Sequence, residues 1–126
     1  MDKNNNRPRY LNLLKIAMPV TAVVSIAHRA SGFLLVIAIP FLIYVFQLSV
    51  SSAAEFNQLL ATLQQPWIKA VLIVLTWSIT HHFFAGIRFL LIDIDWGVSR
   101  SAARTSAWLI HLIAIAVTLA VAGTLL

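Results

Sequence analysis

The stretch GFLLVIAIPFLIYVFQLSV, residues 32–50, carries no charged side chain. An α-helix needs about 20 mostly apolar residues to cross the hydrocarbon core of a bilayer, so this stretch is long enough to span a membrane. Together with the less apolar residues before it, the stretch predicts a first span over about 20–50. Two further apolar runs predict spans over about 66–91 and 105–126. Between the first two spans, residues 51–65 are polar to amphipathic and predict a short helix on the membrane surface.

The composition of the whole chain agrees with this pattern. Of the 126 residues, 60% are hydrophobic and only 10% are charged, and the mean hydropathy is +0.89. Such a chain cannot cover a soluble globule with its own polar side chains. The predicted fold is therefore an all-α integral membrane protein in which residues 1–126 form a single membrane-anchor domain. Cysteine is absent, which excludes disulfides, thiolate metal sites and cysteine-ligated iron–sulfur clusters within this chain.

The net charge of +5 is distributed in a way that predicts membrane topology and not nucleic-acid binding. Basic residues precede the first span or lie between the second and third, whereas the other side of the membrane offers only Lys69. Because basic loops stay in the cytoplasm, residues 1–18 are predicted to be a cytoplasmic N-terminal segment of a multi-pass protein in a bacterial inner membrane. The basic residues on the cytoplasmic side are Lys3, Arg7, Arg9, Lys15, Arg29, Arg88, Arg100 and Arg104.

Two polar clusters accompany the apolar spans: SIAHRASG at residues 25–32 and HHFFAGIR at residues 81–88. A charged side chain deep in hydrocarbon costs roughly 2.5 kcal/mol or more, so histidine and arginine at such positions are candidates for a functional site. The predicted spans place all four histidines of the chain at a similar depth, in the cytoplasmic half of the membrane.

Imidazole is a strong ligand for haem iron, and two imidazoles from facing helices favour electron transfer over oxygen chemistry. His82 has Ser78 and Gly86 one helical turn away on either side, so that a flat macrocycle could approach this face. The adjacent His81 points about 100° away, toward the face of Trp77. An alternative is that these histidines only form hydrogen bonds between helices.

On the first span, Ser25, His28 and Arg29 lie within about one helical turn and share a face. Such a face suits anions and carbonyl groups. Arginine can hold a carboxylate such as a haem propionate through two hydrogen bonds, and serine can donate to a quinone carbonyl. The alternative is that Arg29 extends to lipid phosphates at the membrane surface.

The two clusters contain the patterns S-x-x-H-R-x-S-G and H-x-x-x-G-I-R, which are specific as a pair at this separation. Shorter matches accompany them: RP at 7–8, LN at 11–12, PVTA at 19–22 and Asp93. On these residues the chain resembles the cytochrome b556 membrane-anchor subunit of succinate dehydrogenase over nearly its whole length. The resemblance implies an anchor that is not catalytic toward succinate. Such an anchor helps to pass electrons from an iron–sulfur subunit to ubiquinone, in the respiratory chain and the tricarboxylic acid cycle.

The resemblance also implies roles for individual residues. His82 would be an axial ligand of haem b iron, with the second ligand supplied by a sister membrane-anchor subunit. His28 and Arg29 would face the haem propionates. Ser25 and Arg29 would form part of the ubiquinone pocket, which the iron–sulfur subunit and the sister anchor complete, while a flavoprotein subunit would oxidise succinate. Some relatives carry a histidine directly after G-I-R, where this chain has Phe89, so no role is transferred to that position.

Three alternatives fit the same spans: the anchor of a fumarate reductase, which runs the reaction in the opposite direction, a haem-free structural anchor, and a proton-translocating subunit lined by histidines. A b-type absorption band would separate haem-binding anchors from the other two. His81 and His111 match no position of the patterns and are interpreted as structural.

Overall fold

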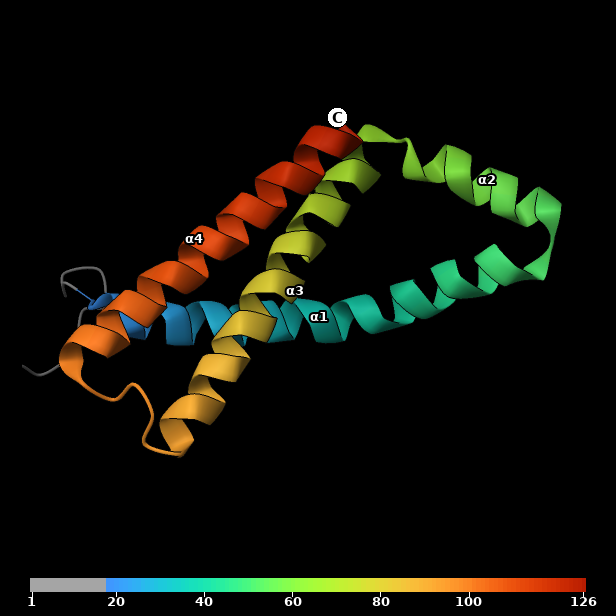
Figure 1. The fold of residues 1–126 in the computed structure, drawn as a ribbon. Coiled ribbons are helices and arrows are strands. Elements are labelled where there is room, and N and C mark those ends of the chain that lie inside the picture. The colour runs from blue at the N-terminus through green and yellow to red at the C-terminus, as the bar shows by residue number, and fades with distance from the viewer. Residues whose placement is uncertain (1–17) are drawn as a thin grey trace, which may run out of the picture.

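The computed structural model describes residues 18–126, which form four α-helices and no β-strand. Three of these helices are long and apolar enough to cross a membrane, and the other is the short helix between the first and second of them (Figure 1). The predicted all-α membrane fold is therefore confirmed. Apart from Met18, the predicted cytoplasmic N-terminal segment lies outside the described residues. The helices are α1 (Val20–Ser51), α2 (Ala53–Leu63), α3 (Pro66–Asp93) and α4 (Arg100–Leu125).

Serine caps explain where two of the helices begin. The Ser52 hydroxyl accepts a hydrogen bond from the backbone N–H of Glu55 at 3.2 Å, and α2 starts directly after this cap. The Ser99 hydroxyl accepts from the backbone N–H of Ala102 at 3.3 Å, so α4 starts at Arg100, before the predicted third span. The first turn of α4 is basic, and for that reason an apolar pattern alone could not reveal it.

Small side chains line the contacts that α3 makes with α1 and α4. Val24 of α1, Ala85 of α3, and Ala107 and Ile110 of α4 form one buried cluster. Lipid is as apolar as these side chains, so membrane helices associate by close packing, which small residues permit. In Figure 1, α1 crosses α3, and α4 runs back beside α3, while α4 also contacts α1. The middle helix is therefore shared by two interfaces.

Most large apolar side chains point away from the bundle. Phe33, Phe46 and Leu90 each expose about two thirds of their surface, at 67%, 67% and 68%. An apolar surface of this extent marks a membrane or protein contact region, because it would promote aggregation in water. On α2, Leu59 is buried against the rest of the bundle, while Phe56 is exposed.

The connection from α3 to α4 turns sharply within residues 94–99. Asp95 and Gly97 have positive φ angles of 59° and 76°, a conformation that costs little for glycine and more for other residues. The backbone N–H of Trp96 donates to the Leu91 carbonyl at 3.0 Å. The turn therefore folds Trp96 back toward the end of α3.

Candidate functional site

Two of the predicted site residues, His28 of α1 and His82 of α3, meet where these helices pack together. Their rings are stacked, with centroids 4.1 Å apart and planes inclined by 7°. Both side chains are half-buried. Phe89 approaches the ring of His28 edge-on, with centroids 5.1 Å apart. Phe89, the residue directly after G-I-R, thus packs against His28.

Hydrogen bonds to α1 fix the His82 ring. Its Nδ1 lies 3.1 Å from the backbone carbonyl oxygen of His28 and 3.3 Å from the Ser31 hydroxyl, and that hydroxyl donates to the same carbonyl at 2.9 Å. A carbonyl oxygen can only accept, so Nδ1 must carry the proton. In neutral imidazole the other nitrogen, Nε2, then holds a lone pair that can bind a metal ion or accept a proton.

A glycine permits this contact. A Cβ atom added to Gly32 would lie 2.9 Å from Cε1 and 3.3 Å from Nδ1 of His82, closer than atoms pack in proteins. The His82 ring therefore sits directly on the backbone of α1. On the other side of the stack, a Cβ atom at Gly86 would lie 3.7 Å from Nε2 of His28, an ordinary contact. Of these two glycines, only Gly32 is required by the geometry.

Ser25 and Arg29 form the second part of the predicted site. An Arg29 N–H group donates to the Ser25 hydroxyl oxygen at 3.4 Å, one helical turn away. The guanidinium group is exposed, and Ser25 is half-buried. Because Arg29 occupies a lone pair of the hydroxyl, the hydroxyl proton stays available to an acceptor outside the chain.

The other two histidines form a second pair, between α3 and α4. His81 is fully buried, and its ring lies 5.2 Å from that of Trp77 and 5.1 Å from that of His111. Both ring nitrogens of His81 and Nε2 of His111 are buried without a hydrogen-bond partner among residues 18–126. The four histidines therefore form two pairs. Helix α3 contributes His82 to the pair with α1 and the adjacent His81 to the pair with α4.

One expectation from the sequence is wrong in detail. Ser78 was expected to leave an open face beside His82, but Ser78 is fully buried and its hydroxyl donates to the Val74 carbonyl of its own helix. Ser78 is covered because α3 packs against both α1 and α4, which sequence periodicity does not reveal.

The sequence did not predict two polar contacts, that of Ser31 with His82 and that of Arg88 with Ser106. Ser31 could have been suspected because it lies three residues after His28, on the same face. Nothing in the sequence indicates that Arg88 bonds to α4.

No cluster of three or more histidine, aspartate or glutamate side chains that could hold a metal ion occurs among residues 18–126. Any metal bound through His82 would therefore need ligands from elsewhere. Haem meets this condition, because the porphyrin supplies four nitrogen ligands and leaves only the axial positions to protein.

Taken together, the fold and the site define a multi-pass α-helical membrane protein with a histidine site between its first two spans. Residues 3–121 match the family described as succinate dehydrogenase/fumarate reductase transmembrane subunit. The chain is 36% identical to the succinate dehydrogenase cytochrome b556 subunit of Coxiella burnetii, over 93% of this chain and 95% of that protein. It is 28% identical to the protein of the same name from Rickettsia prowazekii, over 91% and 90% of the two chains. The chain therefore belongs to the family of succinate dehydrogenase and fumarate reductase transmembrane subunits.

Proposed function

We propose that this chain is the haem b- and quinone-binding membrane anchor of a succinate dehydrogenase, with His82 as an axial ligand of the haem iron. The observation that carries the proposal is the hydrogen bonding of His82. Its Nδ1–H donates to the His28 carbonyl, at 3.1 Å, and leaves Nε2 as the ligand atom. In metal-bound histidines in general, the ring nitrogen that does not bind the metal donates a hydrogen bond of this kind, which orients the ring and raises its basicity. The name of the curated relatives, cytochrome b556 subunit, supports haem b as the group concerned.

Family membership supports the remaining partners. A sister membrane-anchor subunit would supply the second axial ligand, and an iron–sulfur subunit and a flavoprotein subunit would complete the complex. Three spans cannot enclose a macrocycle with two propionates, and exposed polar groups in lipid are costly, so a second helical subunit is physically required. Bound haem supplies a one-electron carrier, and this chain's part is to hold it in place. We place the complex in a bacterial inner membrane with the N-terminus of this chain in the cytoplasm, from the distribution of basic residues.

Arg29 and His28 are suited to the haem propionates. The Arg29 guanidinium group is exposed, and its single hydrogen bond within residues 18–126 goes to Ser25 at 3.4 Å. Arginine has five N–H donors, so enough remain to hold a carboxylate through two parallel bonds. His28 lies against His82, and its own ring can donate a further bond to a propionate beside that ligand.

Ser25 and Arg29 are suited to ubiquinone. Reduction of a quinone takes two electrons and two protons, so its carbonyl oxygens need donors that stabilise developing negative charge. Arg29 binds the Ser25 oxygen and thereby leaves the hydroxyl proton to point at a carbonyl. The guanidinium group beside it stabilises the charge on that oxygen. The electrons would arrive from the iron–sulfur subunit, which would form the opposite wall of the pocket.

The test replaces the proposed ligand in the purified complex. His82→Leu should abolish or shift the b-type absorption band and lower the haem content, because it removes a coordinate bond. His111→Leu is the matched control, since it removes an imidazole at the same level of the bundle from the other pair. If His82→Leu kept the spectrum and His81→Leu lost it, the ligand would be the neighbouring residue. A wild-type complex without a b-type band would instead be a haem-free anchor.

The matching family also includes fumarate reductase, which gives a second candidate. The assembled complex should reduce ubiquinone with succinate faster than it reduces fumarate with a quinol. The opposite ratio would identify a fumarate reductase anchor, with the residue roles unchanged.

A further inference from the structure

Arg88 is a buried cation on a membrane-spanning helix, and only 7% of its surface is exposed. Its Nε–H donates to the Ser106 hydroxyl at 3.0 Å, and a terminal N–H donates to the Ala103 carbonyl at 3.3 Å. Both acceptors are uncharged, and a guanidinium group has five N–H donors, so three have no acceptor among residues 18–126. An unpaired charge in a medium of low dielectric constant is unfavourable, which means that Arg88 requires an anion.

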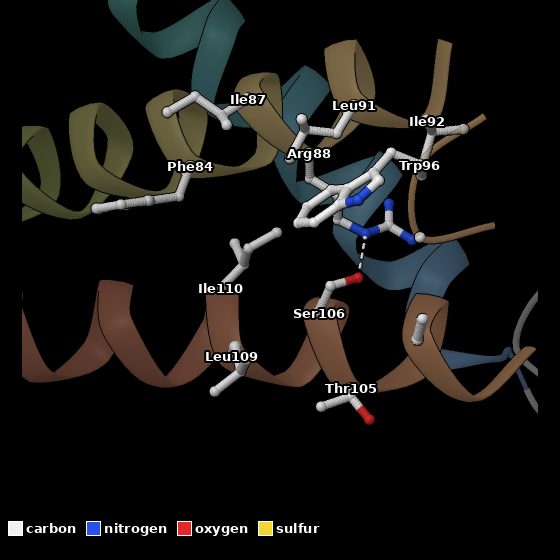
Figure 2. A pocket seen from close by; sticks show the side chains of 12 residues that line it. Phe84, Ile87, Arg88, Leu91, Ile92, Trp96, Thr105, Ser106, Leu109 and Ile110 are labelled. Atoms are coloured by element: carbon white, nitrogen blue, oxygen red, sulfur yellow. Dashed lines mark hydrogen bonds between the residues drawn. The ribbon is translucent and has the colours of Figure 1, made fainter. Parts of the chain in front are cut away.

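A cavity of about 580 Å³ lies beside Arg88, between the ends of α3 and α4. Figure 2 shows how its lining is divided: Arg88, Ser106 and the Trp96 ring lie toward one end, and Phe84, Leu109 and Ile110 lie toward the other. The volume falls within the range of small-molecule sites. The division into a cationic end and an apolar end matches an amphiphile with a negatively charged head.

We propose that this cleft binds an anionic phospholipid, with the phosphate on Arg88 and an acyl chain along Phe84, Leu109 and Ile110. Charge decides between occupants, because a neutral quinone offers no counter-charge, and a zwitterionic lipid would bring its cationic head group next to the other basic residues at this end of the bundle. The first turns of α4 add Arg100 and Arg104 at the same end of the bundle, and basic pockets between spans on the cytoplasmic side are the usual places for anionic head groups. Trp96 closes this end with an indole ring, which favours the membrane interface.

The cleft is separate from the histidine site. Arg88 comes six residues after His82 on α3, so the two side chains point about 120° apart around the helix axis, and Arg88 faces α4 instead of α1. The proposal therefore does not depend on haem or quinone binding.

The first experiment counts the phospholipids that remain on the purified complex in native mass spectrometry, after exchange into nanodiscs of phosphatidylglycerol or phosphatidylcholine. We expect the wild-type complex to retain phosphatidylglycerol preferentially. Arg88→Gln should reduce that preference by roughly 10-fold or more, since charge-assisted hydrogen bonds are the strong ones. Lys69→Gln, which removes one positive charge at the start of α3, should leave it unchanged. A wild-type complex without the preference, or an Arg88→Gln complex that keeps it, would overturn the proposal.

A second pair of variants leaves Arg88 and its hydrogen bonds intact. Leu109 and Leu112 are both exposed on α4, but only Leu109 lines the cleft. Leu109→Trp should fill the apolar end and lower phosphatidylglycerol retention several-fold, whereas Leu112→Trp should not. If instead Arg88→Gln weakened the association of the subunits while lipid retention stayed as in the wild type, the anion would be a carboxylate of a partner subunit, and the lipid proposal would be wrong.

Discussion

Replacement of Gly32 by alanine tests the contact that fixes His82. The added Cβ atom would lie 2.9 Å from Cε1 and 3.3 Å from Nδ1 of the imidazole ring, whereas carbon atoms in optimal contact are about 3.5–4.0 Å apart. Neither a helix backbone nor an aromatic ring can yield locally. The helices must therefore separate by roughly half an ångström or more, or the ring must turn away from the His28 carbonyl.

Three contributions determine how much stability Gly32→Ala should lose. Overpacking a well-packed contact costs about 1–3 kcal/mol, and weakening the hydrogen bond between His82 and His28 adds about 1 kcal/mol. Alanine has a better helix propensity than glycine by at most about 1 kcal/mol. The variant should therefore lose about 1–3 kcal/mol of stability at the interface of α1 and α3, and it should displace the ring that is proposed to bind haem.

The assay follows thermal denaturation of the purified complex by its helical signal and by its b-type absorption. Gly32→Ala should melt at a lower temperature and show an altered haem spectrum. Gly123→Ala, where no atom lies within 4 Å of the added Cβ atom, is the matched control and should be unchanged or slightly more stable. Equal melting temperatures and identical spectra for Gly32→Ala and Gly123→Ala would refute the packing argument.

Three further predictions concern polar side chains. Ser25→Ala should slow quinone reduction about ten- to a hundred-fold, while succinate oxidation with a soluble acceptor that takes electrons upstream stays near normal; unchanged quinone turnover would remove Ser25 from the pocket. Ser31→Ala should shift the haem midpoint potential in a redox titration, because its hydroxyl contacts both His82 and the His28 carbonyl, whereas Ser49→Ala, whose hydroxyl bonds only within its own helix, should not. His81→Phe should leave the melting temperature of the complex unchanged or raise it, since it removes two buried nitrogens that have no partner in the described part of the chain; a marked loss of stability would mean that His81 bonds to a group outside residues 18–126.

The membrane fold could be predicted because the signal is local. Some 20 consecutive apolar residues are needed for each span, and a chain with so few charges has no other stable arrangement for them. The start of α4 could not be found this way, since it depends on the Ser99 cap and a basic first turn. The short helix after the first span is predicted from its amphipathic composition, and the Ser52 cap determines where it begins.

The pairing of the histidines could not be predicted, because the rotation of a membrane helix about its axis is set by packing against its neighbours. His81 and His82 are adjacent in sequence and about 100° apart on the helix. Only the crossing of α1 and α3 decides that His82 meets His28, and only the position of α4 decides that His81 meets His111. The bond from Arg88 to Ser106 is hidden for the same reason.

The spacing of S-x-x-H-R-x-S-G places two sets of residues on one stretch of α1. One set contacts α3, and the other is available to groups outside the chain. His28, Ser31 and Gly32 lie three and four residues apart, so they share the face that meets His82. Ser25 and Arg29, also four residues apart, bond to each other, and Arg29 leaves its guanidinium group exposed. Substitutions in the first set should therefore disturb helix packing and the proposed haem ligand together. Substitutions in the second set should leave packing intact and affect only what binds from outside the chain, which a comparison of melting temperature with quinone turnover across both sets would separate.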